Sequence, residues 1–167
     1  MEERIIFVDQ NDTPIGVGTR EEAWTKGIYM RIVRVILRDE QGRILSQLRS
    51  AEKKSYPNRW TDSASGHIDE GDSYDSAVAR ELKEELGLAT PLTHVGSFAS
   101  KDIVGDKTIL EFNAIYEGKI DSSTILKLQQ SEVADTQWFE LSELKQLTQS
   151  DPNNFTPGFR EIVRRFY

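Results

Sequence analysis

The sequence of 167 residues contains no cysteine. This absence excludes disulfide bonds, thiolate metal sites and a cysteine nucleophile. No apolar run approaches the roughly 20 residues needed to cross a bilayer, so we expect no membrane-spanning segment and no membrane partner. The N-terminal sequence MEERIIFVDQ lacks the basic and then apolar order of a signal peptide, and we therefore expect a cytoplasmic protein.

The chain also has too few basic residues for a nucleic-acid-binding surface. Its 21 lysines and arginines are outnumbered by 28 aspartates and glutamates, which gives a formal net charge of −7. Nucleic-acid binding needs a basic surface, so we expect no nucleic-acid partner. An acidic protein can still bind an anionic small molecule, but only through a local basic cluster or a bound cation.

Short segments bounded by turn residues predict a chain in which strands and helices are mixed. The predicted strands are residues 5–8, 15–18, 28–38, 44–48, 95–99 and 109–116, with a last short strand at Trp138 and Phe139. The predicted helices are residues 19 or 20 to 26, 73–86, 142–147 and 159–166, and residues 50–60 are predicted to form a loop. This mixture favours an α/β sandwich, and the absence of a repeat or linker favours one domain over residues 1–167.

The helix predicted at residues 73–86 carries two different faces, because side chains three and four positions apart lie on the same side. The apolar face contains Val78, Leu82 and Leu86. The acidic face contains Glu81, Glu84 and Glu85. Clustered carboxylates without histidine or thiolate are suited to Mg²⁺ or Mn²⁺ rather than to zinc. A solvated acidic surface gives the same pattern, so the helix alone does not decide between these interpretations.

The segment before this helix adds a second signal. The sequence GHIDEGD begins at Gly66 and leads into the helix, with Asp72 or Ser73 in position to cap its first turn. Free N–H groups and the positive end of the helix dipole favour a phosphate at such a place. We therefore expect the loop at Gly66 to contact a phosphate-bearing substrate beside the metal.

Taken as one string, residues 66–88 resemble the Nudix box, G-x5-E-x7-R-E-U-x-E-E-x-G-U, where U is apolar. Every defined position matches except Asp72, where the family has glutamate. The resemblance implies an α/β/α sandwich with a mixed sheet and a magnesium-dependent hydrolase of a diphosphate linkage. It implies that Glu81, Glu84 and Glu85 bind the metal and that Arg80 orients the loop and the carboxylates. The shorter Asp72 is expected to displace or lose its ion pair with Arg80.

A second resemblance covers residues 48–67, which are similar to the same stretch of isopentenyl-diphosphate isomerases, themselves enzymes with a Nudix fold. It implies that Arg49 and Lys53 bind the substrate diphosphate, which supplies the basic cluster that an acidic protein needs. A solvated basic loop is the alternative for this segment taken by itself.

The residues that isomerase chemistry needs are largely missing. Ser65 stands where those enzymes have cysteine, and a hydroxyl is a much weaker acid and nucleophile than a thiol. The chain has two histidines, His67 and His94, where the isomerases use several as metal ligands. Of their paired glutamates, Glu111 has a match and the other is replaced by Ile109. Glu111, alone on an apolar strand, remains a candidate general base or additional metal ligand, whereas His67 is expected to be structural.

Three functions therefore remain open. The first is a hydrolase of a nucleoside di- or triphosphate or a related X-linked diphosphate, working as a monomer or homodimer. The second is an isopentenyl-diphosphate isomerase. The third is a non-catalytic ligand-binding module, which only the departure at Asp72 favours.

Overall fold

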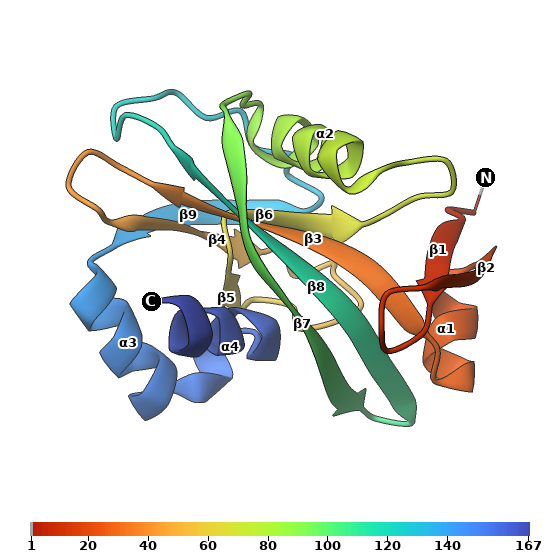
Figure 1. The fold of residues 1–167 in the computed structure, drawn as a ribbon. Helices are drawn as coiled ribbons and strands as arrows, with labels where there is room; N and C mark the ends of the chain where they lie inside the picture. The colour runs from red at the N-terminus through yellow and green to blue at the C-terminus, as the bar shows by residue number, and fades with distance from the viewer. Residues whose placement is uncertain (1) are drawn as a thin grey trace.

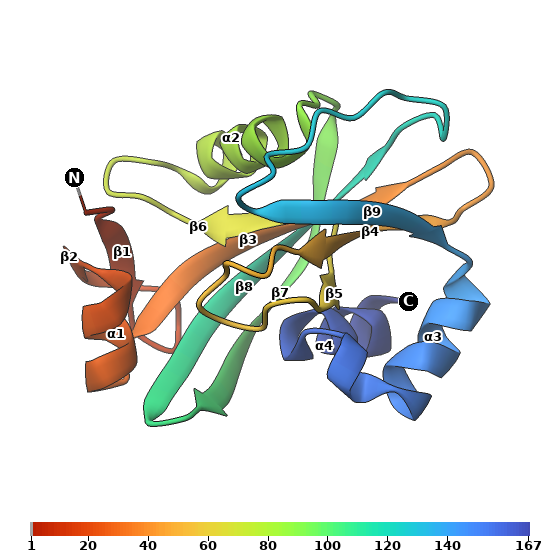
Figure 2. The same cartoon turned by 180° about the vertical axis from the view of Figure 1, so that it is seen from behind.

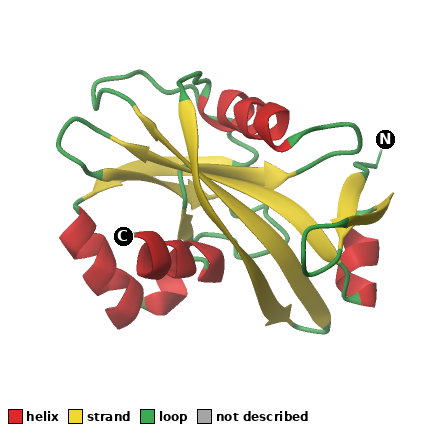
Figure 3. Ribbon diagram, in the orientation of Figure 1, coloured by secondary structure: helices red, strands yellow, loops and turns green. Residues whose placement is uncertain are grey.

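A computed structural model describes residues 2–167 (Figure 1). Its strands are β1 (Ile5–Val8), β2 (Pro14–Gly18), β3 (Tyr29–Arg38), β4 (Ile44–Arg49), β5 (Trp60–Thr61), β6 (Ala64–His67), β7 (Leu92–Val104), β8 (Lys107–Lys119) and β9 (Val133–Phe139). Its helices are α1 (Arg20–Lys26), α2 (Tyr74–Leu86), α3 (Leu141–Ser150), the short 3₁₀ helix η1 (Pro152–Asn154) and α4 (Pro157–Phe166) (Figure 3).

Strand β3 is the centre of a mixed sheet. It pairs antiparallel with β1, β4 and β6, and parallel with β8 along its whole length. Strands β7 and β8 form a long antiparallel hairpin, and β9 adds to the other side of β4. A parallel pair beside antiparallel pairs makes the sheet mixed, as expected.

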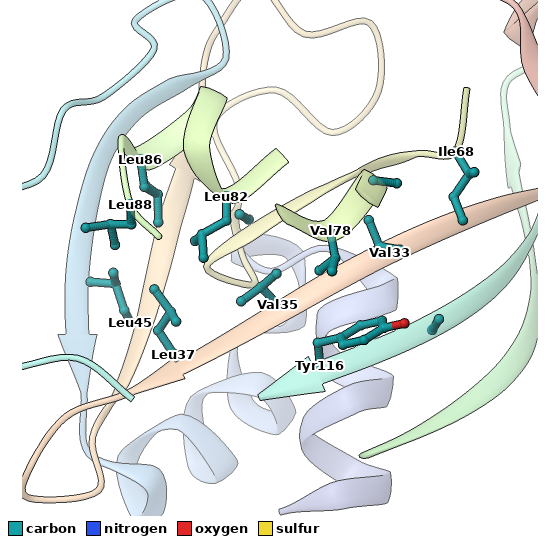
Figure 4. Close-up of a cluster of buried hydrophobic side chains, with 13 residues drawn as sticks. Val33, Val35, Leu37, Leu45, Ile68, Val78, Leu82, Leu86, Leu88 and Tyr116 are labelled. Atoms are coloured by element: carbon teal, nitrogen blue, oxygen red, sulfur yellow. The ribbon is translucent and has the colours of Figure 1, made fainter. Parts of the chain in front are cut away.

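The sheet is covered on both faces. Helix α2 lies on one face, while α3 and α4 lie together on the other (Figures 1 and 2). Alternation along β3 sends Val33 and Val35 towards Leu82 of α2 (Figure 4), and Ile36 towards Phe159 of α4. The predicted α/β/α layering is therefore confirmed.

Helix α2 has well-defined ends. The Ser73 side chain accepts a hydrogen bond from the backbone N–H of Ser76 and forms a capping box with it, so Ser73, not Asp72, is the N-cap. Gly87 ends the helix in the left-handed conformation, with φ of 69°. Glu81 and Glu85 are buried along with the apolar face, which places two carboxylates under the helix rather than in solvent.

Two strands were not predicted, and β7, β8 and β9 are each several residues longer than predicted. Strand β6, with the sequence ASGH, has no alternation of apolar residues, yet it pairs with four consecutive residues of β3. Strand β5 has only two residues and lies at the end of the segment predicted as a loop. Strands β7 and β8 extend beyond residues 95–99 and 109–116, because pairing along the hairpin stabilises polar segments that have no strand pattern of their own. No helix of the described chain is long and apolar enough to cross a membrane.

We expect Leu82→Ala to lower the free energy of unfolding by about 2–5 kcal/mol, because it leaves a cavity where α2 meets the sheet. The matched control is Lys83→Ala, at an exposed position of the same helix, which should change stability by less than about 0.5 kcal/mol. Urea unfolding of the two variants makes the comparison. Equal stability would show that α2 does not depend on this contact.

Candidate active site

A cavity of about 1080 Å³ opens beside α2 and β6 and is bounded by α4, by β7 and β8, and by the loop after β4. All the site residues predicted from the sequence line this one cavity: Arg49, Lys53, Gly66, Arg80, Glu81, Glu84, Glu85 and Glu111. They come from three strands (β4, β6 and β8), the loop after β4 and helix α2. Tertiary folding therefore brings together groups that the sequence suggested separately.

Glu81 packs directly against the backbone of Gly66. A Cβ atom at position 66 would lie only 2.1 Å from Cδ of Glu81, so any other residue would displace this carboxylate. Burial raises the pKa of Glu81 to about 7, although the neighbouring Arg80 favours the charged form. The box glycine is therefore needed here for close approach to the carboxylate.

Glu85 is buried, and none of the described residues forms an ion pair with it. Its carboxylate accepts hydrogen bonds from the Gln47 side chain at 2.6 Å and from the backbone N–H of Ser65 at 3.2 Å. Burial, followed by the negative charge of Glu81, raises the pKa of Glu85 to about 8. Two buried carboxylates thus lie close enough for each to disfavour the charge of the other.

Arg80 lies among the carboxylates at the outer edge of this pair. Its Nη1 atom is 2.6 Å from Oε1 of Glu81 and 3.6 Å from Oε2 of Glu84. Its Nη2 atom is 3.1 Å from Oδ2 of Asp72, so the expectation that the shorter Asp72 would lose this ion pair is wrong. The preceding turn brings the aspartate close enough, and Asp69 adds a further contact at 3.2 Å.

The three box glutamates do not form a ready-made metal site. Glu84 is half exposed and turned towards Arg80, whereas Glu81 and Glu85 lie under the helix. Among the residues that the structure describes, no three histidine, aspartate or glutamate side chains already converge as metal ligands. In this conformation the Arg80 guanidinium contacts the carboxylates where the sequence predicts a cation.

The two predicted diphosphate-binding residues are held in different ways. The Arg49 guanidinium donates to the backbone carbonyl of Ser55, from Nη2 at 2.9 Å and from Nε at 3.1 Å. Burial lowers the pKa of Arg49 although Asp62 and Glu85 oppose this. Lys53 forms an ion pair with Glu132. Among residues 2–167, Arg49 therefore has no carboxylate partner, whereas Lys53 already has one.

A buried ion network beneath the cavity was not predicted from the sequence. The Arg34 side chain donates to Asp62 at 2.8 Å, to Glu111 at 3.0 Å and to Asn113 at 2.7 Å. Gly158 of α4 leaves room for this guanidinium, since a Cβ atom there would lie 2.5 Å from Nη2 of Arg34. An arginine inside the apolar strand IVRVIL was the available signal, because a buried charge requires a partner.

This network fixes the charge of Glu111. Burial would raise the pKa of Glu111, but the adjacent His67 ring and the Arg34 guanidinium outweigh it and lower the pKa to about 2. His67 lies with Nε2 at 3.7 Å from Oε1 of Glu111, and burial lowers the pKa of its imidazole. Arg34 thus favours the charged form of Glu111, whereas burial favours the neutral form of His67.

Comparison with known proteins identifies the family of this chain. The model of the NUDIX domain family matches residues 28–165. An isopentenyl-diphosphate Delta-isomerase 2 from Photorhabdus laumondii is 32% identical over 164 residues, covering 98% of this chain and 92% of that protein. A prenyl-diphosphate phosphatase from Methanosarcina mazei is 31% identical over 162 residues, covering 96% and 92%.

A crystal structure from Deinococcus radiodurans superposes with a TM-score of 0.81 over 99% of both chains, at 24% sequence identity. This likeness concerns the fold alone, and it includes the sheet and helices that surround the cavity. With a family match over most of the sequence and relatives that align along nearly their whole length, this chain belongs to the NUDIX family.

Proposed function

We propose that this protein is a magnesium-dependent hydrolase that cleaves a diphosphate linkage in a small-molecule substrate, either a nucleoside di- or triphosphate or a related X-linked diphosphate. The observation that carries the proposal is the pair of buried carboxylates, Glu81 and Glu85, in the same cavity as Arg49. A divalent cation offsets the mutual repulsion of two such carboxylates. The relative named as a prenyl-diphosphate phosphatase supports hydrolysis of a diphosphate ester.

The residues present fit a hard metal ion. Glu81 and Glu85 offer oxygen ligands at positions where burial makes an uncompensated charge unfavourable, as their raised pKa values indicate. Glu84 completes the set once its contact with Arg80 is exchanged for one with the ion. A bound Mg²⁺ or Mn²⁺ supplies charge neutralisation on the diphosphate and activation of water.

The other residues of the cavity have separate tasks in this proposal. Arg49 has guanidinium donors in the cavity and no carboxylate partner, so it orients the diphosphate. Gly66 keeps the backbone close to Glu81. Of the two roles expected for Glu111, that of general base is disfavoured, because a pKa of about 2 is far from neutral pH. Glu111 then acts as an ionised group that holds Arg34.

We expect Glu85→Gln and Glu84→Gln each to reduce magnesium-dependent hydrolysis at least about 100-fold, which corresponds to about 2.7 kcal/mol of transition-state stabilisation. The measurement is release of phosphate or diphosphate from a panel of nucleotides and prenyl diphosphates. Glu143→Gln, an exposed glutamate on α3, is the matched control and should retain full activity. Wild-type protein that hydrolyses no member of the panel would contradict the proposal.

The two raised pKa values also predict how the metal-free protein responds to pH. Between pH 6.5 and 8.5 the unfolded chain has already lost both protons, whereas folded Glu81 and Glu85 lose theirs with pKa values of about 7 and 8. The native state binds more protons over this range, so its stability must fall as pH rises, by an amount on the order of a few kcal/mol. His67 does not oppose this trend, because its lowered pKa keeps it neutral above pH 6.5.

Thermal unfolding with a chelator and with Mg²⁺, at pH 6.5 and 8.5, measures this effect. We expect the melting temperature of the metal-free protein to fall over this range, Mg²⁺ to restore it, and Glu85→Gln to weaken both responses. A melting temperature that is independent of pH and of Mg²⁺ would argue that these carboxylates are not the metal ligands.

Isoprenoid isomerisation is the second candidate, favoured by relatives that carry the isomerase name. Ser65 lines the cavity, but its hydroxyl is a poor proton donor, and Glu111 is already held by Arg34. The binding-module interpretation depended on Asp72, which forms the ion pair with Arg80 after all. No described contact therefore favours that third function.

We expect no deuterium on carbon when isopentenyl diphosphate is incubated with the protein and Mg²⁺ in heavy water. Mass spectrometry of the recovered allylic and homoallylic diphosphates makes the measurement, with an isopentenyl-diphosphate isomerase run in parallel. Incorporation at a rate that depends on Ser65 would establish the isomerase and displace the hydrolase proposal.

A further inference from the structure

Arg160 on α4 is an arginine in the cavity wall without an ionic partner. Its side chain is partly buried, and its Nε atom is fully buried without any hydrogen-bond partner. Within residues 2–167, no carboxylate forms an ion pair with its guanidinium. Removing part of a guanidinium from water without compensation is unfavourable. Its position is therefore unexplained by the contacts of the protein itself.

Among the described residues, most other arginines of the cavity wall have a carboxylate partner, which Arg160 lacks. Arg34 contacts Asp62 and Glu111, and Arg20 contacts Glu3. Arg80 is surrounded by carboxylates. Even on α4, the neighbouring arginines are neutralised: Arg164 and Arg165 both bind Glu161. Apart from Arg49, which is held by a backbone carbonyl, Arg160 is the arginine of the described cavity wall that remains available to an anion.

Other groups near Arg160 add to the positive electrostatic potential around its guanidinium. Helix α4 directs its first turn, from Pro157, to the cavity, so the positive end of its dipole lies close to Arg160. Lys145 and Lys101 come from elements that pack on α4 and also line the cavity. Asp102 is the nearest acidic residue along β7, and it accepts a hydrogen bond from Tyr56. This wall is cationic in a protein whose net charge is −7.

We propose that Arg160 forms a second anion subsite, which binds a phosphate or carboxylate of the substrate that is remote from the diphosphate being cleaved. The proposal rests on the hydrolase function, because it places the diphosphate at Glu81 and Glu85 and the additional anion at α4. It names the substrate class: a polar diphosphate with a further charged group, as in a phosphorylated nucleotide conjugate. A prenyl diphosphate, whose remaining part is purely apolar, has nothing to offer this guanidinium.

Matched pairs of diphosphates that differ by one remote phosphate test the subsite. Coenzyme A with 3′-dephospho-coenzyme A is one pair, and NADPH with NADH is another. We expect kcat/KM of the wild-type protein with Mg²⁺ to be at least about tenfold higher for the phosphorylated member of a pair, since one charge-assisted contact is sufficient for such a factor. Arg160→Gln should abolish the preference by lowering only the value for the phosphorylated member.

Two control variants separate charge from structure. Arg164→Gln, on the same helix but with its guanidinium already bound to Glu161, should keep the preference. Arg160→Lys should retain part of it, because the charge remains. Equal kcat/KM for both members in the wild type, or an equal loss for both in Arg160→Gln, would overturn the subsite while leaving the hydrolase intact.

Calorimetric titration of the same pairs keeps the two proposals distinguishable if no pair is hydrolysed. Tighter binding of the phosphorylated member, lost in Arg160→Gln and kept in Arg164→Gln, would support the subsite and count against the hydrolase. Equal affinity for both members, or no binding of either, would overturn the subsite.

Discussion

The burial of two like charges beneath α2 is the constraint on which the rest of the site depends. Leu82 and Leu86 hold the helix on the sheet, and the same packing places Glu81 and Glu85 out of solvent. Burial, together with the negative charge of Glu81, raises the pKa of Glu85 and disfavours its ionisation. Gly66 allows the closest of these approaches, and Gln47 offers Glu85 a neutral donor in place of a positive charge. The fold thus stabilises a pair of buried carboxylates whose negative charge is not fully balanced, which is common at functional sites.

The distribution of positive charge follows from the same constraint. An acidic protein that binds an anionic substrate must keep some cations free, yet most cavity arginines and lysines are neutralised by neighbours. Arg34 belongs to the structure, because its contacts with Asp62 and Glu111 allow three charges to be buried at once. Arg49 and Arg160 are the arginines of the described cavity without a carboxylate, one beside the buried glutamates and one on α4.

The relatives that carry the isomerase name share the scaffold of this chain. The chain aligns with them over almost its whole length, so the cavity and its covering elements belong to a common architecture. In this chain position 65 offers a hydroxyl, and Glu111 is bound to an arginine on the central strand. An arginine at position 34 gives Glu111 a permanent cationic partner, and Gly158 provides the space for it. Function in this family therefore depends on a few side chains around a shared cavity.

Elements whose signals are local can be predicted from the order of residues along the chain. Spacing and capping predict helix α2 and strands β3 and β4. They also place Glu81, Glu84 and Glu85 together in one short segment. Tertiary structure alone decided which groups are buried and which groups meet. Strand β6 forms because β3 pairs with it. Asp72 forms an ion pair with Arg80 because the turn at residues 69–72 brings the two together. Within the described chain, the guanidinium of Arg160 has no ion pair because Glu161 binds its neighbours instead. Desolvation and ion pairing depend on which residues are neighbours in three dimensions. The spacing of residues along the sequence does not specify those neighbours.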